Sequence, residues 1–104
     1  MDAANLTGKI ALITGGAAGI GRAIAEAFAA HGAKIIIADK NKARCDAVQS
    51  AFEKKSYDAL VTHTDVTDTA QVQTMMTTVE EQFGKLNILV NNVGDFLELI
   101  KPFK

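Results

Sequence analysis

The amino-acid sequence predicts an α/β fold, half of a doubly wound parallel sheet with the element order βαβαβαβ. Two observations lead to this expectation. Short apolar runs alternate along the chain with segments of helical periodicity, and a glycine-rich turn joins the first run to the first helix. Strands that alternate with helices pair in parallel through right-handed crossovers, and the doubly wound arrangement has the strand order 3-2-1-4. The first two helices are then expected on one face of the sheet and the third on the other.

Each element has its own sequence signal. The apolar runs predict strands at residues 9–14, 33–38, 59–63 and 86–92. Apolar residues at helical spacing predict helices at residues 19–31, at residues 41–54 and between Asp68 and Gly84. Gly32 and Gly84 stand where a left-handed residue commonly ends a helix. Asp68 is expected to N-cap the third helix, with Gln71 at the capping-box position.

Composition limits the class of protein. The 104 residues suffice for one small domain, and 48% of them are hydrophobic, as in a globular core. Eleven basic and 12 acidic residues nearly cancel, so no nucleic-acid partner is expected. A single cysteine, Cys45, excludes an intrachain disulfide and favours a cytoplasmic location. The N-terminal residues show neither a basic region nor a long apolar stretch, so neither a signal peptide nor a membrane span is expected.

The most informative segment is residues 14–21, Thr-Gly-Gly-Ala-Ala-Gly-Ile-Gly, called the glycine loop below. Glycines permit a tight turn and let a ligand approach the backbone. The free N–H groups at the start of the following helix attract an anion. The loop therefore predicts a nucleotide pyrophosphate at Gly15, Gly19 and Gly21, with Ile20 among the cofactor contacts. The alternative is that these glycines serve only to pack the helix close to the strand.

The spacing Gly-x-x-x-Gly-x-Gly after Thr14 resembles the cofactor loop of the short-chain dehydrogenase/reductase family. Three further motifs follow in the order of that family: Asp39, Asp65-Val66 and Asn91-Asn92-Val93-Gly94. The last is similar to the family's Asn-Asn-Ala-Gly, with valine in place of alanine. The resemblance extends from residue 8 to about residue 103. It implies a Rossmann-type sheet that binds a nicotinamide dinucleotide.

Asp39 ends the second strand at the distance, about 20 positions beyond the glycine loop, where an acidic residue accepts hydrogen bonds from the adenosine ribose. A carboxylate there repels the 2′-phosphate of NADP, so NAD is the expected cofactor and NADP the less favoured one. Ala18 lacks the basic side chain that NADP-preferring relatives often carry at that place. Lys40, Lys42 and Arg44 leave an alternative open, in which one of them neutralises Asp39 or reaches a 2′-phosphate.

The two remaining motifs take their roles from the resemblance. Asp65 and Val66 would contact the adenine ring, unless the pair is only a turn before the third helix. Residues 91–94 would brace the central sheet and line the nicotinamide half of the cofactor, with Asn91 and Gly94 as contacts, unless they are only a polar turn. In the predicted topology the glycine loop and residues 91–94 border the same crevice, because they follow the adjacent first and fourth strands.

The resemblance also implies an activity, hydride transfer between the nicotinamide and a carbonyl or alcohol carbon of a small molecule. The family uses a tyrosine as acid or base, a lysine four residues later and a serine. Here the one tyrosine, Tyr57, is followed four residues later by Val61, so no catalytic residue is assigned. Residues 1–104 are then expected to form a single, truncated NAD(P)-binding domain that supplies cofactor binding to a longer parent, and residues 95–104 a tail entering the absent second half.

Whether the chain itself is an enzyme is left open. One alternative is a non-catalytic truncated isoform or pseudoenzyme, acting as a nucleotide-binding or interaction module. Another is a sequence that stops short of its own catalytic residues. Residues 86–90 would form an exposed apolar edge, which favours association with another chain. Cys45 is expected in the core, and no cysteine and histidine cluster suggests a metal.

Overall fold

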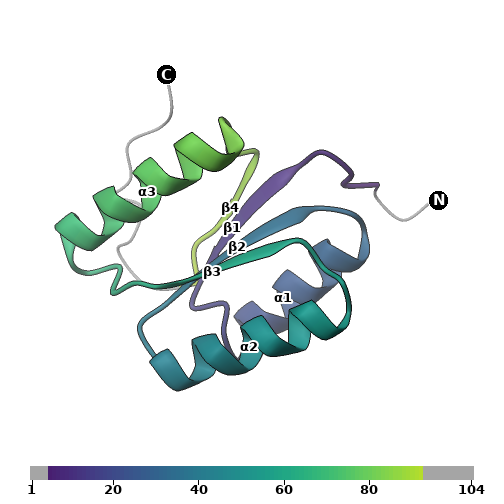
Figure 1. The fold of residues 1–104 in the computed structure, drawn as a ribbon, viewed down its shortest axis with the longest axis horizontal. Helices are drawn as coiled ribbons and strands as arrows, with labels where there is room; N and C mark the ends of the chain where they lie inside the picture. The colour runs from purple at the N-terminus through teal and green to yellow at the C-terminus, as the bar shows by residue number, and fades with distance from the viewer. Residues whose placement is uncertain (1–4, 93–104) are drawn as a thin grey trace.

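The computed structural model describes residues 5–92, and these form a four-stranded parallel sheet with the strand order β3-β2-β1-β4 (Figure 1). The strands are β1 (Ile10–Thr14), β2 (Lys34–Asp39), β3 (Ala59–His63) and β4 (Ile88–Val90). The helices between them are α1 (Gly19–Ala30), α2 (Lys42–Lys54) and α3 (Thr69–Phe83). The predicted fold class, element order and strand order are confirmed.

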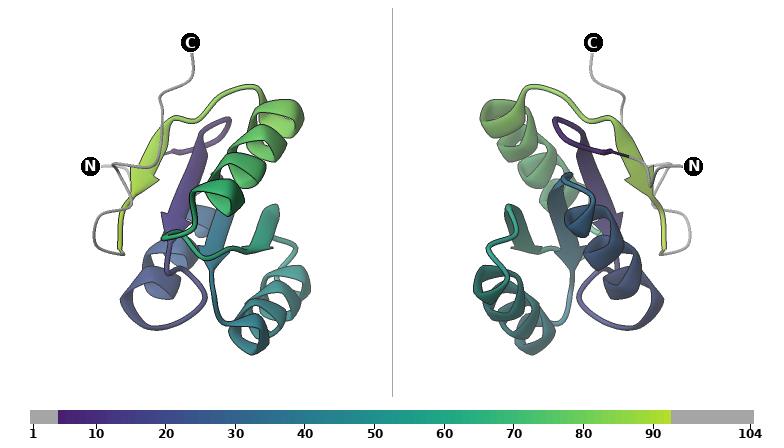
Figure 2. Two further views of the ribbon diagram at one scale, coloured as in Figure 1. Left: turned by 90° about the vertical axis from the view of Figure 1, so that its left-hand side faces the viewer. Right: turned by 90° about the vertical axis from the view of Figure 1, so that its right-hand side faces the viewer.

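The helices cover both faces of the sheet, with α1 and α2 on one side and α3 on the other (Figure 2). Successive side chains of a strand point to opposite faces, so β1 contributes Ile13 to the first core layer and Leu12 to the second. Ile37 and Ile36 of β2 divide in the same way. A sheet covered on both faces explains why its inner strands are continuous apolar runs and do not alternate with polar residues.

The register brings the carboxyl ends of the strands to one edge of the sheet. Thr14 of β1 is paired with Ala38 of β2, and Asp39 with His63 of β3. On the other side Ile13 is paired with Val90 of β4. Loops that follow these strands therefore meet at one end of the sheet, which is where doubly wound folds bind ligands.

Strand β4 is shorter than expected, three residues long within the predicted 86–92. Its pairing with β1 begins beyond Asn87, whose side-chain oxygen accepts a hydrogen bond from the Ile10 N–H (2.8 Å). The Asn87 N–H in turn donates to the Ile10 carbonyl (2.9 Å). β4 forms one edge of the described sheet and its residues are half-buried. Association of another chain through this edge stays a prediction.

The start of α3 departs from the expected capping box in one respect. Asp68 is the N-cap as predicted, and its carboxylate accepts hydrogen bonds from the N–H groups of Ala70 and Gln71 (3.0 and 3.3 Å). The Gln71 side chain does not reach back to the Asp68 N–H, because that group already donates to the Asp65 carbonyl (3.0 Å). The Gln71 side-chain oxygen accepts from the Asp65 N–H at 2.8 Å, so it ties the segment after β3 to α3.

Replacing Asp68 by alanine removes the acceptor for two N–H groups at the start of α3. The free energy of unfolding is expected to fall by about 1 kcal/mol, the usual cost of a lost N-cap. Urea unfolding followed by circular dichroism measures the change. Asp58→Ala is the matched control, since Asp58 is exposed and only 3.8 Å from Lys34, and it should cost less than about 0.5 kcal/mol. Equal losses in the two variants would contradict the capping role.

None of the helices within residues 5–92 combines the length and the apolar character needed to cross a bilayer. The cytoplasmic location expected from the single cysteine stays a prediction.

Candidate functional site

A cleft of about 560 Å³ opens at the carboxyl ends of the strands. Its wall includes six of the residues expected to contact a cofactor: Gly15, Gly19, Ile20, Asp39, Asp65 and Val66. They come from the glycine loop, from the end of β2 and from the segment after β3. The fold has therefore gathered these three sequence motifs around one volume, which Asn92 of the fourth motif also borders. Gly94 and Val93 lie outside the described residues.

The start of α1 borders the cleft through Ala18, Gly19 and Ile20. Gly15 and Gly19 are both left-handed, with φ of 65° and 61°, a conformation that favours glycine. Ala18 occupies the N-cap position without a side-chain acceptor, and the first turn of α1 holds no acidic residue. The first N–H groups of a helix have no partner within it, so here they remain available to an anion.

Gly21 serves close packing. A Cβ atom at this position would stand 2.4 Å from the Gly15 carbonyl oxygen and 2.9 Å from the Asn92 side-chain nitrogen. Gly21 is buried behind the loop and is not part of the cleft wall. The packing explanation therefore applies to Gly21, whereas Gly15 and Gly19 shape the turn that faces the cleft.

Thr14 joins the end of β1 to the segment after β4. Its buried hydroxyl accepts a hydrogen bond from the Asn92 N–H (2.9 Å) and lies 3.3 Å from the Asn91 side-chain oxygen, to which it can donate. The Asn92 side chain donates to the Gly15 carbonyl at 3.4 Å and itself borders the cleft. Asn91 is thus directed at Thr14, and it is Asn92 that reaches the cleft wall. Together, Asn91 and Asn92 connect the end of β4 to Thr14 and Gly15 of the glycine loop.

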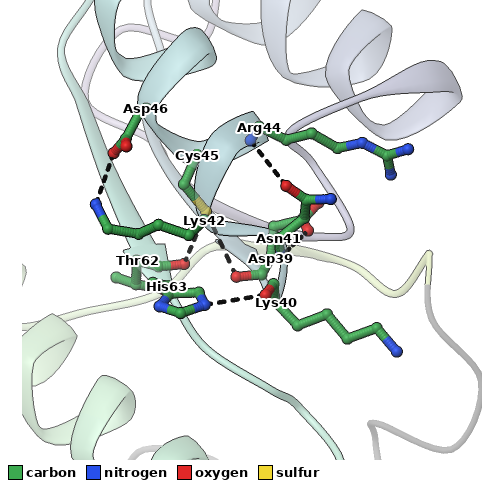
Figure 3. A network of polar contacts seen from close by, with 9 residues as sticks. All are labelled: Asp39, Lys40, Asn41, Lys42, Arg44, Cys45, Asp46, Thr62 and His63. Atoms are coloured by element: carbon green, nitrogen blue, oxygen red, sulfur yellow. Dashed lines mark hydrogen bonds and ion pairs between the residues drawn. The ribbon is translucent and has the colours of Figure 1, made fainter.

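Asp39 ends β2 with both carboxylate oxygens engaged. One accepts from the Asn41 N–H (2.9 Å) and the other from the Ala17 N–H of the glycine loop (3.2 Å). Lys42 does not neutralise this carboxylate, because its ammonium pairs with Asp46 at 2.8 Å, a hydrogen bond that raises the pKa of Lys42 (Figure 3). Within residues 5–92 neither Lys40 nor Arg44 forms an ion pair, and both border the cleft.

Asp65 follows β3 and also borders the cleft. Its carboxylate accepts hydrogen bonds from the Thr67 hydroxyl (2.6 Å) and the Thr67 N–H (2.9 Å), and these contacts lower the pKa of Asp65. The positive charge of Lys40 lowers the pKa further. The contribution of these contacts to stability is present at neutral pH and is lost when acid protonates the carboxylate. Thr64 and Thr67 also border the cleft, and the motif analysis did not single them out.

Three other side chains with reactive groups, those of Tyr57, Cys45 and His63, are not part of the cleft wall. Tyr57 lies on the α1 and α2 side of the sheet, with its ring edge-on to Phe52 at 5.5 Å between centroids. Cys45 is buried as expected, and burial raises the pKa of its thiol, which lies 3.5 Å from the Asp39 carbonyl. His63 contacts the Lys40 carbonyl through its ring nitrogen at 2.9 Å (Figure 3). In the described part of the chain no three histidine, cysteine or acidic side chains gather to hold a metal.

Curated proteins with related sequences are several times longer than this chain. Galactitol 2-dehydrogenase of Agrobacterium fabrum is 47% identical over 91 residues, which are 88% of this chain and 34% of that protein. A tropinone reductase homolog of Arabidopsis thaliana is 45% identical over 91 residues, 86% of this chain and 35% of that protein. The chain thus spans about a third of the length of the curated relatives it matches.

Solved structures share the fold described above. The 2-keto-3-deoxy-D-gluconate dehydrogenase from Streptococcus agalactiae superposes with a TM-score of 0.79 at 41% identity, covering 86% of this chain and 34% of that one. A short chain dehydrogenase/reductase from Burkholderia phymatum, solved in complex with NAD, has a TM-score of 0.77 at 33% identity over 84% of this chain and 31% of that one. The family described as short chain dehydrogenase matches residues 9–103, and this chain therefore belongs to it.

Proposed function

We propose that this chain forms one dinucleotide-binding domain of an NAD-dependent oxidoreductase that transfers hydride between a carbonyl and an alcohol carbon. One observation carries the proposal. The uncapped N-terminus of α1 and the carboxylate of Asp39 border the same cleft, so one volume offers donors for a pyrophosphate and acceptors for ribose hydroxyls. Membership of the family and the relative solved with NAD support a nicotinamide dinucleotide.

The residues around the cleft fit such a ligand part by part. The N–H groups at the start of α1, at Gly19 and Ile20, would bind the pyrophosphate, and the carboxylate of Asp39 would accept from the adenosine ribose. Asp65 and Val66 would contact the adenine ring, with the Asp65 carboxylate held in place by Thr67. When bound, the nicotinamide supplies the hydride chemistry. The residues of this chain bind and orient the dinucleotide, and Asn91 and Gly94 are proposed on its nicotinamide side.

The charges near Asp39 support NAD over NADP. The carboxylate of Asp39 would repel the 2′-phosphate of NADP, and the Ala18 side chain carries no positive charge to attract it. Lys42, one of the three cations left open by the sequence, is engaged by Asp46 on the exposed surface of α2. Lys40 and Arg44 border the cleft and would attract any phosphate group, so the preference for NAD depends on Asp39.

The activity of the whole protein is proposed from its relatives, whose names describe dehydrogenases and a reductase homolog. A small carbonyl or alcohol compound is the proposed substrate class. A non-catalytic nucleotide-binding or interaction module is the second candidate. Among the described residues, Tyr57 packs edge-on against Phe52 and is not part of the cleft wall. Binding of NADH by the whole protein that contains these residues, without turnover of any carbonyl substrate, would favour this second candidate.

The cofactor proposal is tested by thermal unfolding with NADH. At a concentration 100 times the dissociation constant, NADH is expected to stabilise the chain by about 2.7 kcal/mol, a rise in Tm of roughly 10–20 °C. NADPH should need a higher concentration for the same shift. Fluorescence of the nicotinamide measures the binding directly.

The matched variant is Ile20→Asp. Ile20 is 74% exposed in the first turn of α1, where a carboxylate suits the helix dipole and leaves the core untouched. The variant should therefore fold as well as the wild type and yet show no shift with NADH, because its carboxylate repels the pyrophosphate. Absence of a shift in the folded wild-type chain, or an equal shift in Ile20→Asp, would refute the proposed site.

A further inference from the structure

The carboxylate of Asp39 connects two segments that are separate in the sequence. One oxygen accepts from the Asn41 N–H at 2.9 Å, which holds the turn into α2 (Figure 3). The other accepts from the Ala17 N–H at 3.2 Å, in the middle of the glycine loop. The backbone adds a second link nearby, because the Gly15 N–H donates to the Ala38 carbonyl at 2.7 Å. The end of β2 therefore holds the glycine loop from one side.

The loop depends on such a contact for its shape. Ala17 is only 2% exposed, and a buried N–H group without an acceptor is strongly unfavourable. Ala17 stands between the left-handed Gly15 and Gly19, which have wide backbone freedom when nothing restrains them. In the described structure a side chain from another strand supplies the acceptor. A charged acceptor makes a stronger hydrogen bond than a neutral one.

We infer that Asp39 is a positioning residue for the glycine loop, so that the first N–H groups of α1 face the cleft before any ligand binds. The inference rests on the proposed function and extends it, since the same carboxylate is proposed to bind the ribose. Both roles are compatible, because a carboxylate has about four acceptor positions and the two backbone N–H groups use two of them. Lys40, Arg44 and Asp65 are the other charged groups bordering this cleft.

This arrangement has a consequence for cofactor preference. The residue that selects NAD through its ribose contact also shapes the site for the phosphates. A substitution of Asp39 therefore weakens phosphate binding even for a ligand that has no ribose hydroxyl to recognise. A carboxylate that contacted only the ribose would show no such effect.

Asp39→Asn separates the two roles. The amide keeps the shape of the side chain but offers one oxygen and one NH₂ group, so one of the two backbone N–H groups loses its acceptor. Binding of ADP and of 2′,3′-dideoxy-ADP is measured by titration calorimetry. We expect the variant to bind the dideoxy nucleotide about five to ten times more weakly than the wild type does. Asp58→Asn is the control, with the same change of charge at a residue outside the cleft wall, and should bind both nucleotides normally.

A second measurement needs no ligand. The amide proton resonance of Ala17 in the wild-type chain is followed by NMR as the Asp39 carboxyl group is protonated. We expect the Ala17 and Asn41 resonances to move together with the side-chain carboxyl carbon of Asp39, and the movement of Ala17 to be absent in Asp39→Asn. If Asp39→Asn fails to fold, the wild-type titration alone decides. The inference is overturned if the chemical shift of the Ala17 amide proton does not change when Asp39 is protonated.

The two proposals fail in different ways. A wild-type chain that binds neither nucleotide refutes the proposed function, and the Ala17 titration still decides whether Asp39 holds the loop. A wild-type chain that binds both nucleotides, with unchanged affinity for the dideoxy nucleotide in Asp39→Asn, refutes the positioning role alone.

Discussion

Replacing Phe52 by alanine is expected to lower the free energy of unfolding by about 3–5 kcal/mol. Phe52 lies near the end of α2, is 1% exposed and belongs to the core layer beneath α1 and α2. Its ring also meets Tyr57 edge-on at 5.5 Å. The substitution removes the buried ring and leaves a cavity that the surrounding strands cannot fill without moving. Because a domain of this size has only about 5–15 kcal/mol of stability, the variant should be near the limit of folding.

Urea unfolding followed by circular dichroism measures the loss. Phe83→Ala is the matched control, because Phe83 ends α3 and is only partly buried against the other core layer. Its loss should be clearly smaller, since less apolar surface returns to water. If Phe83→Ala destabilises the chain as much as Phe52→Ala does, the layer beneath α1 and α2 is not the main core.

Replacing Gly21 by alanine should abolish nucleotide binding and cost about 1–3 kcal/mol of stability. The added methyl group would stand 2.4 Å from the Gly15 carbonyl oxygen, closer than a real Cβ contact allows. Alanine is the better helix former, so its intrinsic propensity should stabilise α1 and oppose this loss. To relieve the clash, either α1 or the glycine loop must move. Either movement displaces the N–H groups proposed to bind the pyrophosphate.

Gly84→Ala controls for the general effect of replacing a glycine. Gly84 ends α3 with φ of 74°, and a Cβ atom there would meet nothing within 4 Å. Alanine should cost about 1–2 kcal/mol through the left-handed backbone and leave NADH binding unchanged. Thermal unfolding with and without NADH compares the two variants. Normal NADH binding by Gly21→Ala would contradict the proposed phosphate site, because the N–H groups displaced by the clash would then not be needed for binding.

Much of the fold could be predicted because its signals are local. Apolar runs and helical periodicity depend on neighbouring residues, and the stop at Gly84 and the cap at Asp68 lie within one turn of the helix they bound. The strand order followed from the restricted handedness of crossovers. Strand β4 was predicted too long, because its three paired residues are set by contact with β1 and not by its own apolar run.

The candidate site could be predicted in outline for a related reason. Parallel strands bring their carboxyl ends together, so residues that follow strands in the sequence meet in the fold. The glycine loop, Asp39 and Asp65 indeed border one cleft. The contact of Thr67 with Asp65 was not predicted, although a threonine two residues after an aspartate is a common turn pattern that could have indicated this contact.

By itself the sequence determined the element order, the sheet order and the set of motifs that meet at the cleft, since periodicity, helix ends and crossover handedness are encoded in short segments. Only the tertiary structure decided which side-chain and backbone groups of those motifs form hydrogen bonds with one another. Thr14 binds the backbone of Asn92, 78 residues further along the chain. Asp39 accepts a hydrogen bond from the Ala17 N–H, 22 residues earlier in the chain. Such partners depend on distances and directions between elements, which no pattern along a single segment contains.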